Sequence, residues 1–132
     1  MKSLLLPFVF AFAFNALSQG QSSKRISAKL FYSLTQKHPD ALIVDVRPSE
    51  KFAQYRIKNA LPAPVKNDLL KLEGVVEKSD SIFVYCEKDL RSGPAAEVLD
   101  SLGYHNVFEL KGGLISWRKN GLPLDDKPLS DQ

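Results

Sequence analysis

Apolar residues along the chain form two kinds of pattern. Short runs rich in Val, Ile and Phe, bounded by turn-forming residues, are typical of buried strands and occupy residues 41–46, 82–86 and 107–110. Elsewhere, apolar residues recur at the three- and four-residue spacing of a helix. The predicted helices cover 28–37 after a Ser27 cap, a short segment reaching Gln54, a segment from a cap at Asn67 to Leu72, residues 94–102, and a segment from Gly113 to Gly121. Alternating strands and helices predict an α/β domain with a central parallel sheet and helices on both faces.

The first 20 residues have the order of a secretory signal peptide. Lys2 precedes an uncharged apolar run from Leu4 to Phe14, and small residues follow up to Gly20. The run is shorter than the roughly 20 residues that a transmembrane helix needs, so an uncleaved anchor is the lesser alternative. We therefore expect a periplasmic or secreted protein that has no membrane attachment after cleavage.

The rest of the chain divides into a polar linker, one compact domain and a polar end. We assign the signal peptide to 1–20, the linker to 21–25, the domain to 26–124 and a C-terminal tail to 125–132. About 110 residues remain after cleavage, which is enough for a single hydrophobic core. We expect a monomer.

Composition excludes several classes of protein. The chain has 132 residues, 44% of them hydrophobic, so it can sustain a core and is not disordered. Its net charge of +3 comes without a basic run, so we expect no nucleic-acid partner. The single cysteine excludes an internal disulfide and a Cys-rich zinc site. His38 and His105 lie in turn-like segments without a third ligand nearby, so we expect no metal and no cofactor.

The single cysteine, Cys86, ends the second predicted strand. In open α/β sheets, ligands and chemistry gather beyond the carboxyl ends of the strands. A six-residue loop, Cys86 to Arg91, leads into a helix, whose dipole and the loop N–H groups favour a thiolate. Arg91 offers a fork of donors to an oxyanion, unless it pairs with Asp45 or a helix. The alternative for Cys86 is a small buried hydrophobic residue, and the residues alone leave both interpretations open.

Four stretches of the sequence resemble a known family. They read ISAKLF, LIVDVRPSEKFAQYRIKNALPAP, IFVYCEKDLRS and LGYHNVFELKGGLISWRKNGLPL. Residues 26–124 are similar to a single rhodanese domain, in particular to the small secreted members of that family. The resemblance implies a sulfurtransferase in which Cys86 takes sulfane sulfur from a small donor such as thiosulfate. The resulting persulfide passes its sulfur to a thiol or cyanide, or to a protein acceptor.

The resemblance also implies which residues form the site. The spacing Cys-x4-Arg matches the sulfurtransferase loop, whereas the related phosphatases and arsenate reductases have one more residue there. The implied substrate-binding residues are Glu87, Lys88, Asp89, Leu90 and Arg91. Asp45 and Arg47 match an Asp-Val-Arg motif that supports the loop, or form a structural ion pair. Arg56 lines the pocket or is exposed.

This chain departs from the family pattern at three places. Glu87 replaces a residue that is often basic, Asp89 replaces a frequent glycine, and residues 55–60 replace Gly-His-Ile-Pro-Gly-Ala. Asp tolerates a left-handed backbone, so the loop can still close. The two acids cancel Lys88 and Arg91, so we expect slow turnover of thiosulfate or a different donor.

Two glycines and a tryptophan near the end of the domain complete the prediction. We expect Gly112 and Gly113 to allow a close approach of chain near the loop, and Trp117 to pack in the core. Two other functions remain as alternatives. One is a binding module that holds a persulfide or a partner without turnover, because fold does not determine function. The other is a small phosphatase-like enzyme.

Overall fold

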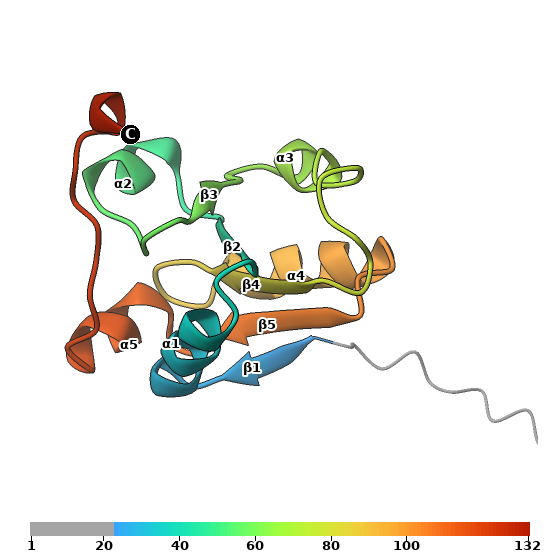
Figure 1. Cartoon of the computed structure of the whole chain (residues 1–132), viewed down its shortest axis with the longest axis horizontal. Coiled ribbons are helices and arrows are strands. Elements are labelled where there is room, and N and C mark those ends of the chain that lie inside the picture. The colour runs from blue at the N-terminus through green and yellow to red at the C-terminus, as the bar shows by residue number, and fades with distance from the viewer. Residues whose placement is uncertain (1–22) are drawn as a thin grey trace, which may run out of the picture.

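A five-stranded sheet forms the centre of the molecule (Figure 1). The computed structural model describes residues 23–132, so the predicted signal peptide lies outside the described residues. The strands are β1 (Lys24–Ile26), β2 (Leu42–Asp45), β3 (Leu61–Pro62), β4 (Ser81–Tyr85) and β5 (Asn106–Leu110). Their order across the sheet is β1-β5-β4-β2-β3, and every neighbouring pair is parallel.

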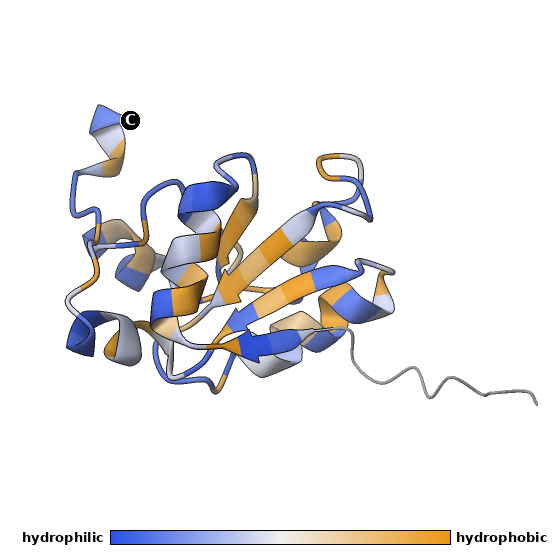
Figure 2. Ribbon diagram, turned by 60° about the horizontal axis from the view of Figure 1, so that its bottom comes forward, coloured by the Kyte–Doolittle hydropathy of each residue, from blue (hydrophilic) through white to orange (hydrophobic). Residues whose placement is uncertain are grey.

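Helices cover both faces of this sheet. They are α1 (Ala28–Lys37), α2 (Ser49–Gln54), α3 (Lys66–Leu70), α4 (Ser92–Ser101), α5 (Gly113–Lys119) and a 3-10 turn, η1 (Leu129–Asp131). Side chains of α1 and α5 share one buried cluster with Ile43, Phe83 and Tyr85, whereas those of α3 and α4 share the other with Val44 and Val84. The central strands are accordingly the most apolar part of the ribbon (Figure 2). The predicted α/β fold with a covered parallel sheet is confirmed.

Local signals account for the ends of most elements. The side chain of Ser27 caps α1 by accepting the N–H of Leu30, as predicted. The α4 helix begins at Ser92, two residues earlier than predicted, because Pro94 is tolerated inside a first helical turn. The prediction of a cap at Asn67 is wrong: α3 begins at Lys66 after Val65 and ends at Leu70.

The expected linker at 21–25 is partly a strand. Lys24 and Arg25 belong to β1, which pairs with β5 so that Arg25 lies opposite Glu109. A three-residue edge strand made mostly of charged residues has no apolar run, and charged residues are common where an edge must stay soluble. Only the pairing with β5 identifies it.

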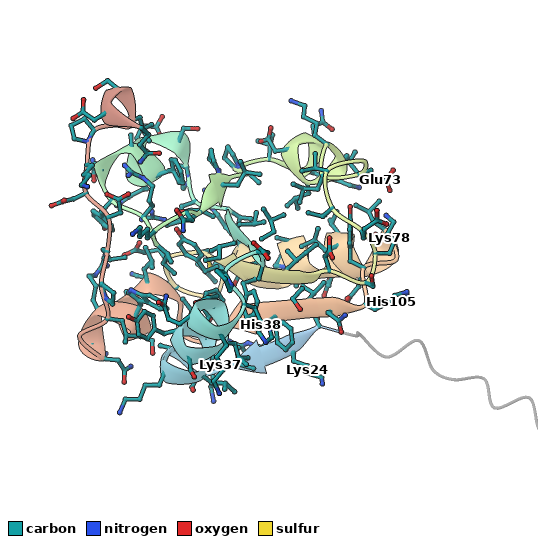
Figure 3. All side chains as sticks on the ribbon, in the orientation of Figure 1. Lys24, Lys37, His38, Glu73, Lys78 and His105 are labelled. Atoms are coloured by element: carbon teal, nitrogen blue, oxygen red, sulfur yellow. The ribbon has the colours of Figure 1, made fainter. Side chains whose placement is uncertain are left out.

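The remaining sequence expectations concern single side chains. Trp117 is buried against Phe31 and Tyr32, and its ring N–H donates to the carbonyl of Pro123 at 2.9 Å, so its place in the core is confirmed. His38 and His105 lie at the surface (Figure 3). Within residues 23–132, no helix is long and apolar enough to cross a membrane.

Candidate active site

Cys86 is the first residue after β4, at the carboxyl edge of the sheet. Its side chain is 2% exposed and lies at the bottom of a cavity of about 140 Å³. We call this cavity the mouth, and its lining residues are Arg47, Pro48, Lys51, Cys86, Glu87, Lys88, Leu90 and Arg91. The structure therefore brings together Cys86 and four of the five predicted loop residues, and Arg47 joins them. Asp89 is the loop residue that does not line the mouth.

Asp89 stabilises the conformation of the loop, although it does not line the mouth. Its φ of 78° is left-handed, a conformation that glycine adopts freely and that Asp tolerates better than most residues. One carboxylate oxygen accepts the N–H of Gly112 at 2.7 Å, and the other lies 2.9 Å from the guanidinium of Arg25. These contacts stabilise the turn that a glycine would otherwise form. Among the described residues, the N–H groups of 88–91 donate to no protein acceptor, so they are available to an anion.

The first turn of α5 holds the other side of the loop. The N–H groups of Leu114 and Ile115 donate to the carbonyls of Cys86 and Glu87, at 2.9 and 3.3 Å. A Cβ on Gly113 would lie 2.3 Å from the carbonyl oxygen of Glu87, and the φ of Gly113 is +58°. Only glycine fits there, which confirms the close approach predicted from the glycine pair.

The two acids of the loop are paired with arginines from outside it. Glu87 contacts Arg118 through one carboxylate oxygen and lies 3.4 Å from Arg47 through the other. Asp89 is paired with Arg25. The expectation that these acids cancel the charge of the loop is therefore wrong, because their partners come from β1, α5 and the segment after β2. The sequence shows no contact between segments this far apart.

Cations consequently predominate at the mouth. Lys51, Lys88 and Arg91 line it, and Arg91 forms no ion pair with any described residue. The predicted alternative for Arg91, an ion pair with Asp45, does not occur. A small cavity above a thiol in which lysine and arginine outnumber acidic side chains attracts anions.

Asp45 and Arg47 form a buried pair that also supports the loop. The guanidinium of Arg47 lies 2.8 Å from the Asp45 carboxylate and 3.4 Å from that of Glu87, and it also donates to the carbonyl of Tyr55 at 2.5 Å. Burial by itself lowers the pKa of Arg47, but the hydrogen bond and charge of Asp45 raise that pKa above its usual value. Both roles suggested by the sequence, the ion pair and the support, thus belong to the same two residues.

Tyr85 completes this buried cluster. Its hydroxyl donates to Asp45 at 2.6 Å and accepts the N–H of Ile57 at 3.1 Å. Burial, followed by the charge and hydrogen bond of Asp45, raises the pKa of Tyr85 well above its usual value of 10.0. The cluster ties β2, β4 and the segment after α2 together beneath the mouth.

The thiol has a polar partner on its buried side. The Cys86 thiol donates to the hydroxyl of Ser92 at 3.3 Å, and that hydroxyl donates to the carboxylate of Glu109 at 2.8 Å. Ser92 is 0% exposed and Glu109 is 4% exposed. Sequence reasoning missed both residues. The signal available was a single acid, Glu109, inside an otherwise apolar strand.

Arg56 lies apart from the mouth and has a structural role. It is 1% exposed and donates to the carbonyls of Phe52, Ala53 and Lys127 at 2.9, 3.0 and 3.1 Å. Its backbone also pairs with that of Asp125 in an antiparallel bridge. The prediction that Arg56 lines the pocket or is exposed is therefore wrong, because it anchors the expected C-terminal tail to the domain.

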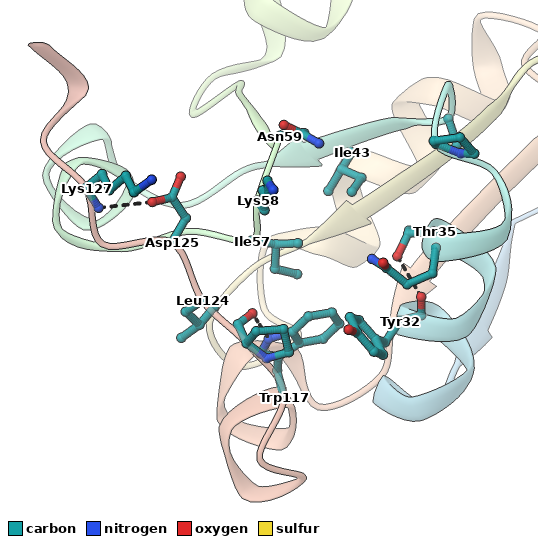
Figure 4. A pocket seen from close by; sticks show the side chains of 14 residues that line it. Tyr32, Thr35, Ile43, Ile57, Lys58, Asn59, Trp117, Leu124, Asp125 and Lys127 are labelled. Atoms are coloured by element: carbon teal, nitrogen blue, oxygen red, sulfur yellow. Dashed lines mark hydrogen bonds between the residues drawn. The ribbon is translucent and has the colours of Figure 1, made fainter. Parts of the chain in front are cut away.

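Two further hollows lie outside the mouth. A cavity of about 510 Å³ between α1, α5 and residues 123–127 has Tyr32 and Trp117 in its wall, and no residue of the Cys86 loop lines it (Figure 4). An apolar groove of about 420 Å³ lies beside the mouth, between α3 and α4, and shares Leu90 and Arg91 with it. Leu90 is 81% exposed. Within residues 23–132, no group of three or more His, Cys, Asp or Glu side chains could hold a metal ion.

Comparisons with known proteins agree with this geometry. A family model for the rhodanese-like domain matches residues 27–120. The chain is 34% identical over 85 residues to a sulfurtransferase of Allochromatium vinosum, covering 64% of this chain and 78% of that protein. It is 36% identical over 72 residues to the thiosulfate sulfurtransferase PspE of Escherichia coli, covering 54% of this chain and 68% of that protein. The crystal structure of the Alr3790 protein from Anabaena matches with a TM-score of 0.71 at 30% identity, covering 80% and 86% of the two chains. The matched residues run from α1 to α5 and include the loop after Cys86, and the chain therefore belongs to the rhodanese-like domain family.

Proposed function

We propose that this protein is a sulfurtransferase that carries sulfane sulfur as a persulfide on Cys86. In the first half-reaction the Cys86 thiolate attacks the outer sulfur of thiosulfate, a new S–S bond forms, and the S–S bond to sulfite breaks. Sulfite leaves with the electron pair. In the second, cyanide or a thiolate attacks the outer sulfur of the persulfide, and the Cys86 thiolate leaves unchanged.

The observation that carries this proposal is the mouth above Cys86. A thiol at the bottom of a small cavity, with lysine and arginine side chains around its opening, suits attack on a small anion. The free N–H groups of 88–91 and Arg91 can hold the oxygens of the departing sulfite. Pairing of both loop acids with arginines removes the reason for expecting weak activity on thiosulfate.

Intact-mass spectrometry tests the covalent step. Incubation with thiosulfate should add the mass of one sulfur atom, and a reductant should remove it. The Cys86→Ser variant should gain nothing, and an adduct on that variant would disprove the assignment to Cys86. Transfer to cyanide then separates an enzyme from a binding module, which would load without turnover. Hydrolysis of an aryl phosphate without any sulfur adduct would favour the phosphatase alternative.

Neutralising one cation at the mouth tests the proposal that positive charge there attracts the anionic sulfur donor. One exposed charge contact is worth about 0.2–1 kcal/mol, and about twice that against a dianion, so Lys88→Gln should lower kcat/KM for thiosulfate roughly 2- to 30-fold. High salt should reduce the difference. The control is Lys37→Gln, which removes an exposed charge at the end of α1 that lines none of the three hollows (Figure 3). Equal effects of the two variants would show that the mouth does not select anions.

We also propose that the protein is exported. The support is the order of Lys2, the apolar run and the small residues at its end. N-terminal sequencing of protein from the native host should find a start near residue 21. A membrane-bound chain that keeps Met1 would establish the anchor instead.

A further inference from the structure

Cys86, Ser92 and Glu109 form a continuous chain of hydrogen bonds that leads away from the mouth into the protein. The two links measure 3.3 Å from Sγ of Cys86 to Oγ of Ser92 and 2.8 Å from there to Oε1 of Glu109. All three side chains are almost fully buried. A thiol this deeply buried has little contact with bulk water, so its proton needs an acceptor inside the protein.

The sheet register brings this chain together. Val84 of β4 lies opposite Glu109 of β5, and side chains of a strand alternate between faces, so Cys86 and Glu109 point to the same face. The first turn of α4 covers that face and places Ser92 between them. The neighbouring side chains of this cluster are apolar.

A buried carboxylate in such surroundings is costly unless it is paired. The charged side chain nearest to Glu109 is Arg25 of β1, whose Nε lies 3.7 Å from Oε1 and whose other end is paired with Asp89. From α4 the carboxylate receives only the hydrogen bond that the Ser92 hydroxyl donates. Arg25 is thus shared between two acids, and Glu109 is poorly compensated for a buried anion.

We infer that Glu109 is the proton acceptor of this site and that Ser92 relays the proton from Cys86 to it. Before the proton moves, the thiol donates to Ser92 and Ser92 donates to the Glu109 carboxylate. The S–H bond then breaks as Oγ of Ser92 gains that proton, and Ser92 passes its own proton to Oε1 of Glu109. The products are a thiolate that accepts a hydrogen bond from Ser92, and a neutral carboxylic acid.

This transfer leaves the total charge of the buried cluster at minus one. The negative charge moves from a place with a shared partner to the mouth, where the loop N–H groups and the helix dipole of α4 stabilise it. Neutral Glu109 also repels neither the incoming donor nor the persulfide anion. The inference rests on the proposed thiolate chemistry of Cys86 but can be tested without any sulfur donor.

The test is the pH profile of Cys86 alkylation by iodoacetamide, a neutral reagent, followed by mass spectrometry. In the wild type, internal transfer does not depend on pH, so the rate should be nearly constant through neutral pH and fall only in acid. In Glu109→Gln and Ser92→Ala the plateau should disappear, with rates near pH 7 lower by on the order of 10²-fold and recovering in alkali. The control is Glu77→Gln, the same chemical change at an exposed position that forms no ion pair with a described residue.

The direction of the change separates this role from two others. If Glu109 only repels the thiolate, its removal would move the profile to lower pH, and if it is only structural, folded variants would keep the wild-type profile. Either result overturns the inference. If the variants lose the plateau but the wild type takes no sulfur from any donor, the inference about Glu109 stands and only the proposed function is refuted.

A measurement on the wild type covers the case in which the variants do not fold. The infrared spectrum of unloaded protein at neutral pH should contain the carbonyl band of a buried, protonated carboxylic acid. That band should be absent from Cys86→Ser, because its hydroxyl does not give up a proton. Identical carboxyl bands in the two proteins would overturn the inference.

Discussion

Replacing Glu87 by glutamine tests whether the acid of the loop supports the structure or restrains the reaction. Its carboxylate accepts hydrogen bonds from the guanidinium groups of Arg47 and Arg118. The other guanidinium nitrogens of Arg47 donate to the carboxylate of Asp45 and to the carbonyl of Tyr55. Glutamine keeps the size and one acceptor oxygen but loses both charge contacts. We therefore expect Glu87→Gln to weaken the anchoring of the loop rather than to activate the enzyme.

The size of the effect follows from the burial of the partners. The contact with Arg118 is partly exposed and worth about 0.2–1 kcal/mol, whereas the hydrogen bond from buried Arg47 to a charged group is worth more, up to about 3 kcal/mol. Because glutamine retains part of this bond, the free energy of unfolding should fall by about 1–3 kcal/mol. For a domain of this size that lowers Tm by roughly 5–15 °C.

Two assays on the same samples decide between the two roles. Thermal unfolding measures the stability, and the rate of the sulfur adduct with thiosulfate at low and high salt measures the reaction. The expected result is a lower Tm with a loading rate within about threefold of the wild type where the protein is fully folded. The control Glu77→Gln changes the net charge equally and should leave Tm within the range of ordinary surface substitutions.

A different outcome would refute this reasoning. If Tm is unchanged and the loading rate rises on the order of tenfold at low salt only, Glu87 repels the donor and the ion pairs are irrelevant. That is the behaviour expected from the loop sequence taken alone.

Three further substitutions test the support around the mouth. Gly113→Ala should abolish sulfur loading and lower the free energy of unfolding by more than about 2 kcal/mol, because its Cβ would overlap a loop carbonyl. The control Gly121→Ala has a similar φ but open space around the new Cβ, so it should cost only about 1–3 kcal/mol of backbone strain and keep loading. Equal effects of the two substitutions would contradict this explanation. Asp45→Asn leaves Arg47 buried without its anion and should destabilise the protein by about 3–5 kcal/mol in urea unfolding; a loss below about 1 kcal/mol would show that the pair is dispensable. The pKa of Tyr85 is higher in the folded than in the unfolded chain, so its contribution to the free energy of unfolding is complete below pH 10.0 and is lost as the pH rises further. The free energy of unfolding should therefore fall more steeply above pH 10.0 in the wild type than in Tyr85→Phe. Identical slopes would contradict the pKa direction.

Much of the fold was predictable because its signals are local. A strand after a turn, a helix after Ser27 and a strand that ends just before Cys86 are each set by residues close in sequence. The errors at β1 and α3 have the same origin. Both are short elements with few apolar residues, and pairing with a distant strand or packing against α4 decides them.

The same distinction between local signals and contacts of distant segments applies to the candidate active site. The sequence alone determined an α/β domain, a cysteine at the carboxyl end of a strand, and a short loop leading from it to a helix. It also showed that the loop contains two acids. Only the tertiary structure decided that Arg25, Arg47 and Arg118 pair with those acids, that Arg56 faces the C-terminal segment, and that Glu109 lies beneath the thiol. Ion pairs and hydrogen bonds between segments far apart in the chain depend on strand order and register, which no local pattern of residues records.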